Sequence, residues 1–254
     1  MNASAGEISA ELPAGRSLLR PALAALILSM TTILLVGLGI WQIERRTSKL
    51  ELIASVDRRV HASPTSAPGP AEWPRLNARD DAYRHVSLSG HFLQGYQTLV
   101  QAVTERGPGY WVLVPFETDA GFRLLINRGY VTPEQAAAGA AAHRPPTGDV
   151  AIAGLLRMSE PGGAFLRANH PADDRWYSRD VAEIAAAQGL GAIAPYFVDA
   201  DASASPASVP VGGLTVISFP NNHLVYALTW FGLAIMTAGW MVYLLREELR
   251  RPTV

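Results

Sequence analysis

The chain has 254 residues, no cysteine, and 22 acidic against 21 basic side chains, and its charged fraction of 17% lies below the roughly 25% of soluble domains. A net charge of −1 offers no basic surface for phosphates, so we expect no nucleic-acid partner. The lack of cysteine excludes disulfides, iron–sulfur clusters and thiolate-bound metal ions.

Two apolar segments of 23 residues each explain the low charge. The first, Pro21–Ile43, has no charged residue, and the second is His223–Leu245. At about 1.5 Å per residue, each is long enough for a hydrocarbon layer of about 30 Å. A cleaved signal peptide has an apolar run of about 7–15 residues and a small-residue cleavage site, and the first segment has neither. We therefore predict two spans of a lipid bilayer.

The spans divide the rest of the chain into a tail at 1–20, a domain at 44–222 and a tail at 246–254. Basic residues close to span ends mark the cytoplasmic side. The stretch 202–222 has no Lys or Arg, whereas three arginines follow the second span within its tail. We predict a cell (inner) membrane protein with both termini cytoplasmic and the domain at 44–222 extracytoplasmic, on the periplasmic side in a bacterium.

The segment after the first span continues a helical pattern. Apolar residues recur near helical spacing at Leu52, Ile53, Val56 and Val60, so we expect the helix to leave the membrane and end before residue 61. Four prolines between residues 61 and 74 then predict a loop or extended linker without regular structure.

Six short segments rich in β-branched and aromatic residues predict strands. They lie at residues 83–92, 96–103, 110–119, 121–131, 149–157 and 193–200. Turn residues separate the first four, which read as an antiparallel meander. Two short helices are expected beside them, one capped by Thr132 with an alanine run to Ala142, and one from Asp180 to Gly189. Strands with segregated helices predict an α+β domain.

Catalytic motifs are missing from this sequence. It has no nucleophile elbow, Walker loop or dinucleotide fingerprint. His85 and His91 share one predicted strand six residues apart, but a metal site normally needs a third ligand nearby, which favours two half-exposed strand residues. We therefore predict that the protein is not an enzyme.

The start of the second span carries the most suggestive chemistry. Trp230 lies seven residues after His223, so the two side chains share a helix face about 10 Å apart along the axis, with Tyr226 on the same stripe. Trp230 must pack on the partner helix or on a bound apolar ligand. By position alone, His223 is either an interfacial anchor for the helix or an axial haem ligand.

Two further groups are candidates for partner binding. Asn127, Arg128 and Gly129 end a predicted strand; they form either a docking surface or a turn with a positive φ at glycine and a local ion pair of the arginine. Trp41 and Gln42 lie at the outer end of the first span.

Five short sequence motifs occur in an order that is typical of one protein family. They are Gly39-Ile40-Trp41-Gln42, Tyr83-Arg84-His85-Val86, Asn127-Arg128-Gly129-Tyr130, Glu160-Pro161-Gly162, and the run from Pro220 to Trp230. Placed between two spans, they resemble the Surfeit-locus family of cytochrome c oxidase assembly proteins over nearly the whole chain beyond residue 35.

The resemblance implies an assembly factor that binds haem a and helps to place it into subunit I of cytochrome c oxidase, with haem a synthase as a second partner. It implies His223 as ligand of the haem iron and Trp230 at the haem site. We add Tyr226 from the same stripe and Arg45 for the propionates. The alternative is a two-span receptor or scaffold whose outer domain binds a small ligand or a partner without haem.

Overall fold

The computed structural model describes residues 19–164, 166–202, 209–215, 217 and 219–250. The chain divides into two compact units: a helical unit of Met1–Glu51 and Pro220–Val254, and a sheet unit of Leu52–Phe219. The expected α+β fold with a candidate membrane helix toward each terminus is confirmed.

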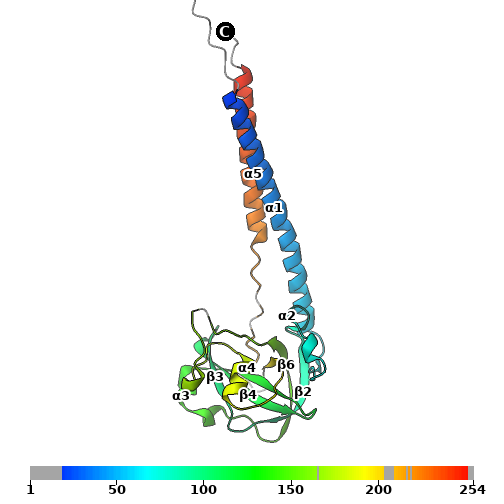
Figure 1. Cartoon of the computed structure of the whole chain (residues 1–254), viewed down its shortest axis with the longest axis vertical. Helices are drawn as coiled ribbons and strands as arrows, with labels where there is room; N and C mark the ends of the chain where they lie inside the picture. Colours follow the sequence, from blue (N-terminus) through cyan, green and yellow to red (C-terminus); the bar gives the residue numbers. More distant parts are fainter. Residues whose placement is uncertain (1–18, 165, 203–208, 216, 218, 251–254) are drawn as a thin grey trace, which may run out of the picture. The chain divides into compact units, whose positions relative to one another are not determined.

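The helical unit consists of α5 (His223–Arg250) and the part of α1 (Leu19–Val60) before residue 52. The two helices lie side by side (Figure 1), and the Thr32 and Thr237 hydroxyl oxygens are 2.9 Å apart across the seam. Buried seam residues recur at seven-residue spacing, as Leu35 and Gln42 on α1 and as Ala227 and Ala234 on α5. This heptad spacing is typical of closely packed helix pairs. α1 also continues past the apolar run and ends at Val60, as predicted.

The described residues of the sheet unit form seven strands, and all six predicted strands are among them. Their bounds are β1 (Thr65–Ser66), β2 (His85–Phe92), β3 (Thr98–Thr104), β4 (Gly107–Thr118), β5 (Arg123–Val131), β6 (Asp149–Met158) and β7 (Tyr196–Ala200). The strand order is β1-β2-β6-β7-β5-β4-β3, with an additional pairing of β2 with β4.

That additional pairing closes the sheet into a ring of five strands. β2 pairs with β6 along its length and with β4 through Gly90, His91 and Phe92. The approach is so close that a Cβ on Gly90 would lie 2.1 Å from the Glu117 carbonyl oxygen. Glycine is therefore required where the ring closes, and its φ of +150° also favours glycine.

The predicted antiparallel meander forms for β3, β4 and β5, but the prediction is wrong for β2, which pairs with β6 and β4 and not with β3. β7 inserts between β5 and β6 and runs parallel to β5, and β1 runs parallel to β2. Short-range turn signals cannot show such pairings, because β7 begins 65 residues after β5 ends (196 − 131).

The proline-rich linker is more ordered than expected. It contains β1 and the 3-10 turn η1 (Trp73–Arg75). The Trp73 ring packs edge-on against Phe122 at 5.9 Å, and the buried Tyr196 hydroxyl donates to the Pro68 carbonyl at 2.8 Å. Burial of aromatic rings thus holds a segment that its prolines alone would leave irregular.

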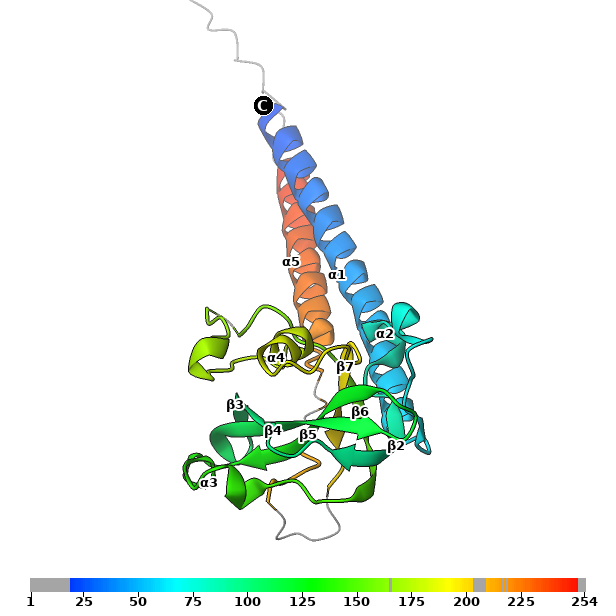
Figure 2. The ribbon, with the colours of Figure 1, turned by 60° about the horizontal axis from the view of Figure 1, so that its bottom comes forward.

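Strand alternation divides the buried side chains into two clusters. Leu124 and Ile126 on β5 face the interior of the ring, whereas Leu125 faces outward. The outer cluster is covered by α4 (Val181–Ala187), which lies over one face of the sheet (Figure 2). On β5 and β7, the side chains two residues after Leu125 and Phe197 point to the same side of the sheet. They therefore lie at the edge of the face that α4 covers.

The helix caps follow the sequence closely, but one helix is shorter than predicted. Thr132 forms a capping box with Gln135 at the start of α3 (Pro133–Ala137), and Asp180 caps α4. The alanine run does not continue α3, because Gly139 adopts a φ of +87° and a separate 3-10 turn, η2 (Ala140–His143), follows. The remaining short helices are α2 (Ala78–Asp81) and η3 (Pro171–Asp173).

Candidate functional site

His223 is the first residue of α5 and is held by a residue of α1. Its Nδ1 lies 2.8 Å from the Oε1 of Gln42, which is only 9% exposed. An amide oxygen is only an acceptor, so Nδ1 carries the proton. In a neutral imidazole this leaves the lone pair of Nε2 available to bind a metal ion, with the ring orientation fixed by the second hydrogen bond.

Trp230 lies two turns further along the same helix. Ala227, between it and His223, is fully buried, which places this stripe on the α1 side of α5. The Trp230 Nε1 is buried and has no acceptor among the described residues. The Asn221 Oδ1 is also buried, and no described residue donates a hydrogen bond to it. Unpaired polar atoms in an apolar surrounding are costly unless a ligand or water satisfies them.

Close helix contact in this unit depends on Gly39. A Cβ at this position would lie 2.5 Å from the Phe231 ring, whereas a Cβ on Gly37 or Gly232 would meet nothing within 4 Å. Gly37 and Gly232 therefore have no part in the close approach of the helices. They lie on the open side of their helices, and Gly39 permits the close approach.

The other predicted residues of the helical unit are exposed. Tyr226 is 54% exposed and Trp41 is 49% exposed, and Arg45 lies one turn after Gln42 with an exposed side chain. Tyr226 therefore points away from the seam rather than into it. The side chains of Trp41 and Arg45 are free to contact lipid, a cofactor or a partner.

The residues at this end of the helix pair suit an iron porphyrin. His223 offers a nitrogen lone pair, Trp230 an N–H donor without an acceptor, and Asn221 an oxygen without a donor. An imidazole whose other nitrogen is hydrogen-bonded is the usual neutral haem ligand. The protein could thus hold haem through His223, with Arg45 available for a propionate.

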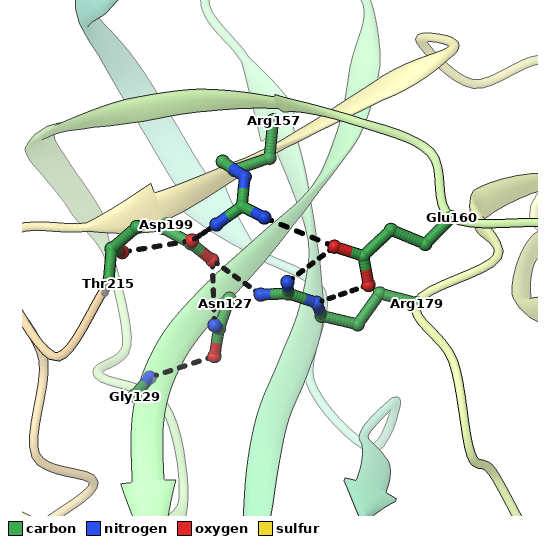
Figure 3. Close-up of polar contacts among 7 residues, drawn as sticks. All are labelled: Asn127, Gly129, Arg157, Glu160, Arg179, Asp199 and Thr215. Carbon is green, nitrogen blue, oxygen red and sulfur yellow. Dashed lines mark hydrogen bonds and ion pairs between the residues drawn. The ribbon is translucent and has the colours of Figure 1, made fainter. Parts of the chain in front are cut away.

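A second polar cluster lies in the sheet unit around Asp199 (Figure 3). Asp199 is 4% exposed and accepts from Asn127 at 2.7 Å, Arg157 at 2.9 Å, Arg179 at 3.2 Å and Thr215 at 2.9 Å. All four lone-pair positions of the carboxylate are used, so its burial is fully compensated.

Glu160 completes the cluster and balances its charge. It accepts from Arg179 Nε at 2.9 Å and from Arg157 Nη2 at 3.2 Å. Burial alone would lower the pKa of Arg179, but the charge of Asp199 and the hydrogen bond and charge of Glu160 raise it above its ordinary value. Two arginines and two carboxylates therefore form a neutral network, which indicates a structural role.

This network explains one of the predicted docking residues. Asn127 is 3% exposed, and its Oδ1 accepts from the Gly129 amide at 3.1 Å. Gly129 has the predicted positive φ, +128°, and a Cβ there would lie 2.2 Å from the Val211 carbonyl oxygen. Both residues are thus held inside the sheet unit.

Arg128 has a different environment from its two neighbours. Its Nη1 donates to the His143 carbonyl at 2.6 Å, so its polar partner among the described residues is a carbonyl rather than the expected carboxylate. Burial lowers the pKa of Arg128. Burial and the charge of Arg128 lower the pKa of His143 below its ordinary value.

The two predicted strand histidines and one carboxylate of the sheet unit complete the comparison of sequence with structure. His85 and His91 each face a carboxylate, Asp201 at 2.8 Å and Asp149 at 3.7 Å, and the described residues hold no group of three potential metal ligands. Sequence reasoning missed Asp199. The sequence did contain a sign of it: Asp199 lies two residues after Phe197 on a predicted strand, so the two side chains point to the same side of the sheet. This places a carboxylate on a covered face.

Comparisons with known proteins agree on one family. The SURF1 family matches residues 29–235. Surfeit locus protein 1 of Rattus norvegicus is 33% identical over 219 residues, covering 80% of this chain and 69% of the relative. A SURF1-like protein of Monosiga brevicollis is 33% identical over 225 residues, 83% of each chain. Surfeit locus protein 1 of Homo sapiens is 32% identical over 220 residues, 80% of this chain and 71% of the relative.

Proposed function

The chain belongs to the SURF1 family, and we propose that it is a membrane-anchored assembly factor for cytochrome c oxidase that holds haem a at one end of its helix pair. In this proposal it delivers haem a to subunit I, or stabilises it there, and catalyses no reaction of its own. Haem a synthase is the proposed source of the haem.

One observation carries the haem part of the proposal. The hydrogen bond from His223 Nδ1 to Gln42 Oε1 leaves the other ring nitrogen free for iron. Trp230 adds a buried N–H without an acceptor on the same helix face. If the protein did not bind haem, His223 would only anchor the end of the helix. That role gives no reason for the free lone pair of His223 Nε2 or for the unpaired N–H of Trp230.

The chain's own residues would have distinct tasks. Gln42 fixes the tautomer of His223, and His223 binds the iron. Trp230 contacts the ligand, and Arg45 neutralises a propionate. Haem a itself combines an isoprenoid tail that partitions into lipid with two propionates that prefer water, so an end of a helix pair suits both parts.

Haem content tests this assignment. The full chain is purified in detergent from cells that make haem a, and haem is measured by its absorption spectrum and by extraction. We expect haem in the wild type, its loss in His223→Ala, and binding weakened by about 10–100-fold in Gln42→Leu. His91→Ala, which changes an exposed histidine of the sheet unit, should retain haem.

Oxidase activity separates binding from assembly. A strain that expresses only His223→Ala should show reduced haem a absorbance in its membranes and reduced oxidase activity. Unchanged haem content in His223→Ala would refute the ligand assignment. Normal oxidase content in a strain lacking the whole gene would refute the assembly function and favour a receptor or scaffold.

A further inference from the structure

A groove at the edge of the sheet unit has no part in the proposed haem chemistry. β3 is the last strand in the sheet order, so one of its sides has no neighbouring strand. Beside it lies a groove of about 590 Å³. We call it the β3 groove; its principal lining residues are Gln101, Val103, Pro108, Tyr110, Arg167 and Tyr177.

The backbone of β3 is open at Val103. The Gln101 amide points away from β4, because it donates to the Trp176 carbonyl at 2.9 Å. Val103 is two residues further along the strand, so its N–H and C=O point the same way. Trp176 bridges to Val100 only, which leaves these two groups of Val103 without a backbone partner among the described residues.

Two aliphatic side chains beside this edge are almost fully exposed. Val103 is 87% exposed and Leu166 is 89% exposed, whereas the next most exposed large apolar residue described in the sheet unit, Tyr96, is 41% exposed. Leu166 lies between Ala164 and Arg167, which both line the β3 groove. An open strand edge with exposed apolar side chains is a pairing surface that proteins normally avoid.

Leu166 is also an unusual residue for its backbone conformation. Its φ is +60°, a left-handed value that favours glycine or asparagine and is strained for leucine. Strain of this kind together with exposure of an aliphatic side chain points to a use for that side chain.

No described residue neutralises the positive charge of the groove. Arg167 donates to the Gln101 side-chain oxygen at 3.3 Å, and its guanidinium lies 5.4 Å from the centre of the Tyr177 ring. Neither partner carries a negative charge. Among the described residues Arg167 has no ion pair, so an acidic group on a ligand would be favoured there.

We infer that the β3 groove binds an extended segment of a partner protein, which pairs its backbone with Val103 and contains alternating apolar residues and an acidic residue. Its backbone would supply the missing hydrogen bonds, an apolar side chain would cover Val103 and Leu166, and a carboxylate would meet Arg167. Strand addition at a sheet edge is an established mode of peptide recognition. This inference does not depend on haem, because none of its residues belongs to the helical unit.

Synthetic peptides test the inference on the full chain in nanodiscs. The probe is a fluorescent heptapeptide of alternating valine and threonine with one glutamate in place of a threonine. We expect saturable binding, slower hydrogen exchange of the Val103 amide, and binding about tenfold weaker when lysine replaces the glutamate. A version with proline at alternate positions should not bind, since it cannot form the ladder.

Substitutions distinguish the groove from other surfaces. Leu166→Gly relieves the backbone strain, so the thermal midpoint should stay the same or rise. The affinity for the glutamate peptide should fall about tenfold, because an apolar contact is lost. Arg167→Gln should remove the preference for glutamate over lysine. Tyr96→Ala, at an exposed aromatic residue outside the groove, should change neither the affinity for the peptide nor the preference for glutamate. Failure of the glutamate peptide to saturate, or equal binding by Leu166→Gly, would overturn the inference.

Discussion

Asp199 accepts hydrogen bonds from four side chains that come from separate parts of the sheet unit. Asn127 belongs to β5, Arg157 to β6, Arg179 precedes α4, and Thr215 lies in the segment that follows β7. One carboxylate thus ties together segments that are far apart in the sequence. Removal of Asp199 would take one acceptor from each of these donors, of which Asn127 and Arg179 are buried.

Asp199→Ala should therefore destabilise the sheet unit strongly. We expect a loss of about 3–5 kcal/mol in the free energy of unfolding, because the substitution leaves buried arginine charge uncompensated. Denaturant unfolding of the full chain in detergent, followed by tryptophan fluorescence, measures this loss. The control is Asp173→Ala, which removes the carboxylate of the exposed ion pair with Arg175 and should change stability little. Equal effects of the two substitutions would show that the network does not stabilise the fold.

His85 predicts a pH dependence of stability. Its Nδ1 faces the Ala62 carbonyl at 3.0 Å and its Nε2 faces the Asp201 carboxylate at 2.8 Å, so both hydrogen bonds form only when the ring is protonated. Burial alone would lower the pKa of His85, but the hydrogen bonds to Asp201 and Ala62 and the charge of Asp201 raise it above 6.5.

The sign follows from the raised pKa in the folded state. The stabilising contribution of His85 is fully present below its unfolded value of about 6.5 and is lost as the pH rises through the folded value. The thermal midpoint of the wild type minus that of His85→Gln should therefore be larger at pH 6 than at pH 8. His143 is unchanged in both proteins, so its opposite pKa shift cancels in the difference. A difference that does not vary with pH would contradict the prediction.

At the scale of elements, the seam between α1 and α5 depends on one small residue. Gly39→Val should push the Phe231 ring away, because even a Cβ would lie 2.5 Å from it. Gly37→Val makes the same chemical change on the open side of α1 and serves as the matched control. Since the chain has no cysteine, seam contact can be measured as disulfide formation in a double variant, Thr32→Cys with Thr237→Cys. We expect slower formation with Gly39→Val and no change with Gly37→Val.

Local signals in the sequence predicted the individual helices and strands better than they predicted how the strands pair. Thr132 and Asp180 cap helices as expected, because capping depends on residues within one turn. The place of β7 between β5 and β6 depends instead on contacts between distant segments. The same limit applies to the alanine run, where Gly139 ended a helix that alanine propensity alone would continue.

The candidate sites show the same division. The shared face of His223 and Trp230 follows from seven-residue spacing on a helix, and the structure confirms that Ala227 on this face is buried. The partnership of His223 with Gln42 joins residues 181 positions apart. No spacing rule connects them, nor the four donors around Asp199, so sequence alone could not predict these contacts.

At the scale of the whole molecule, the absence of cysteine makes the membrane topology directly testable. Val103 in the sheet unit is 87% exposed and Leu249 near the end of α5 is 86% exposed, so Val103→Cys and Leu249→Cys introduce equally accessible thiols. In sealed right-side-out vesicles, a membrane-impermeant maleimide should label Val103→Cys at once and Leu249→Cys only after permeabilisation. The reverse order of labelling would invert the proposed orientation.

The closed ring also has a consequence for how the chain is made. β5 ends at Val131 and β6 at Met158, but the strand that joins them, β7, begins only at Tyr196. At about 5–20 residues per second, the stretch from Val131 to Tyr196 takes roughly 3 to 13 s to synthesise. During this time the facing edges of β5 and β6 have no native partner, and unpaired edges invite association with other chains. The facing edges of β5 and β6 therefore stay open until β7, the last named strand of the sheet unit, has been synthesised.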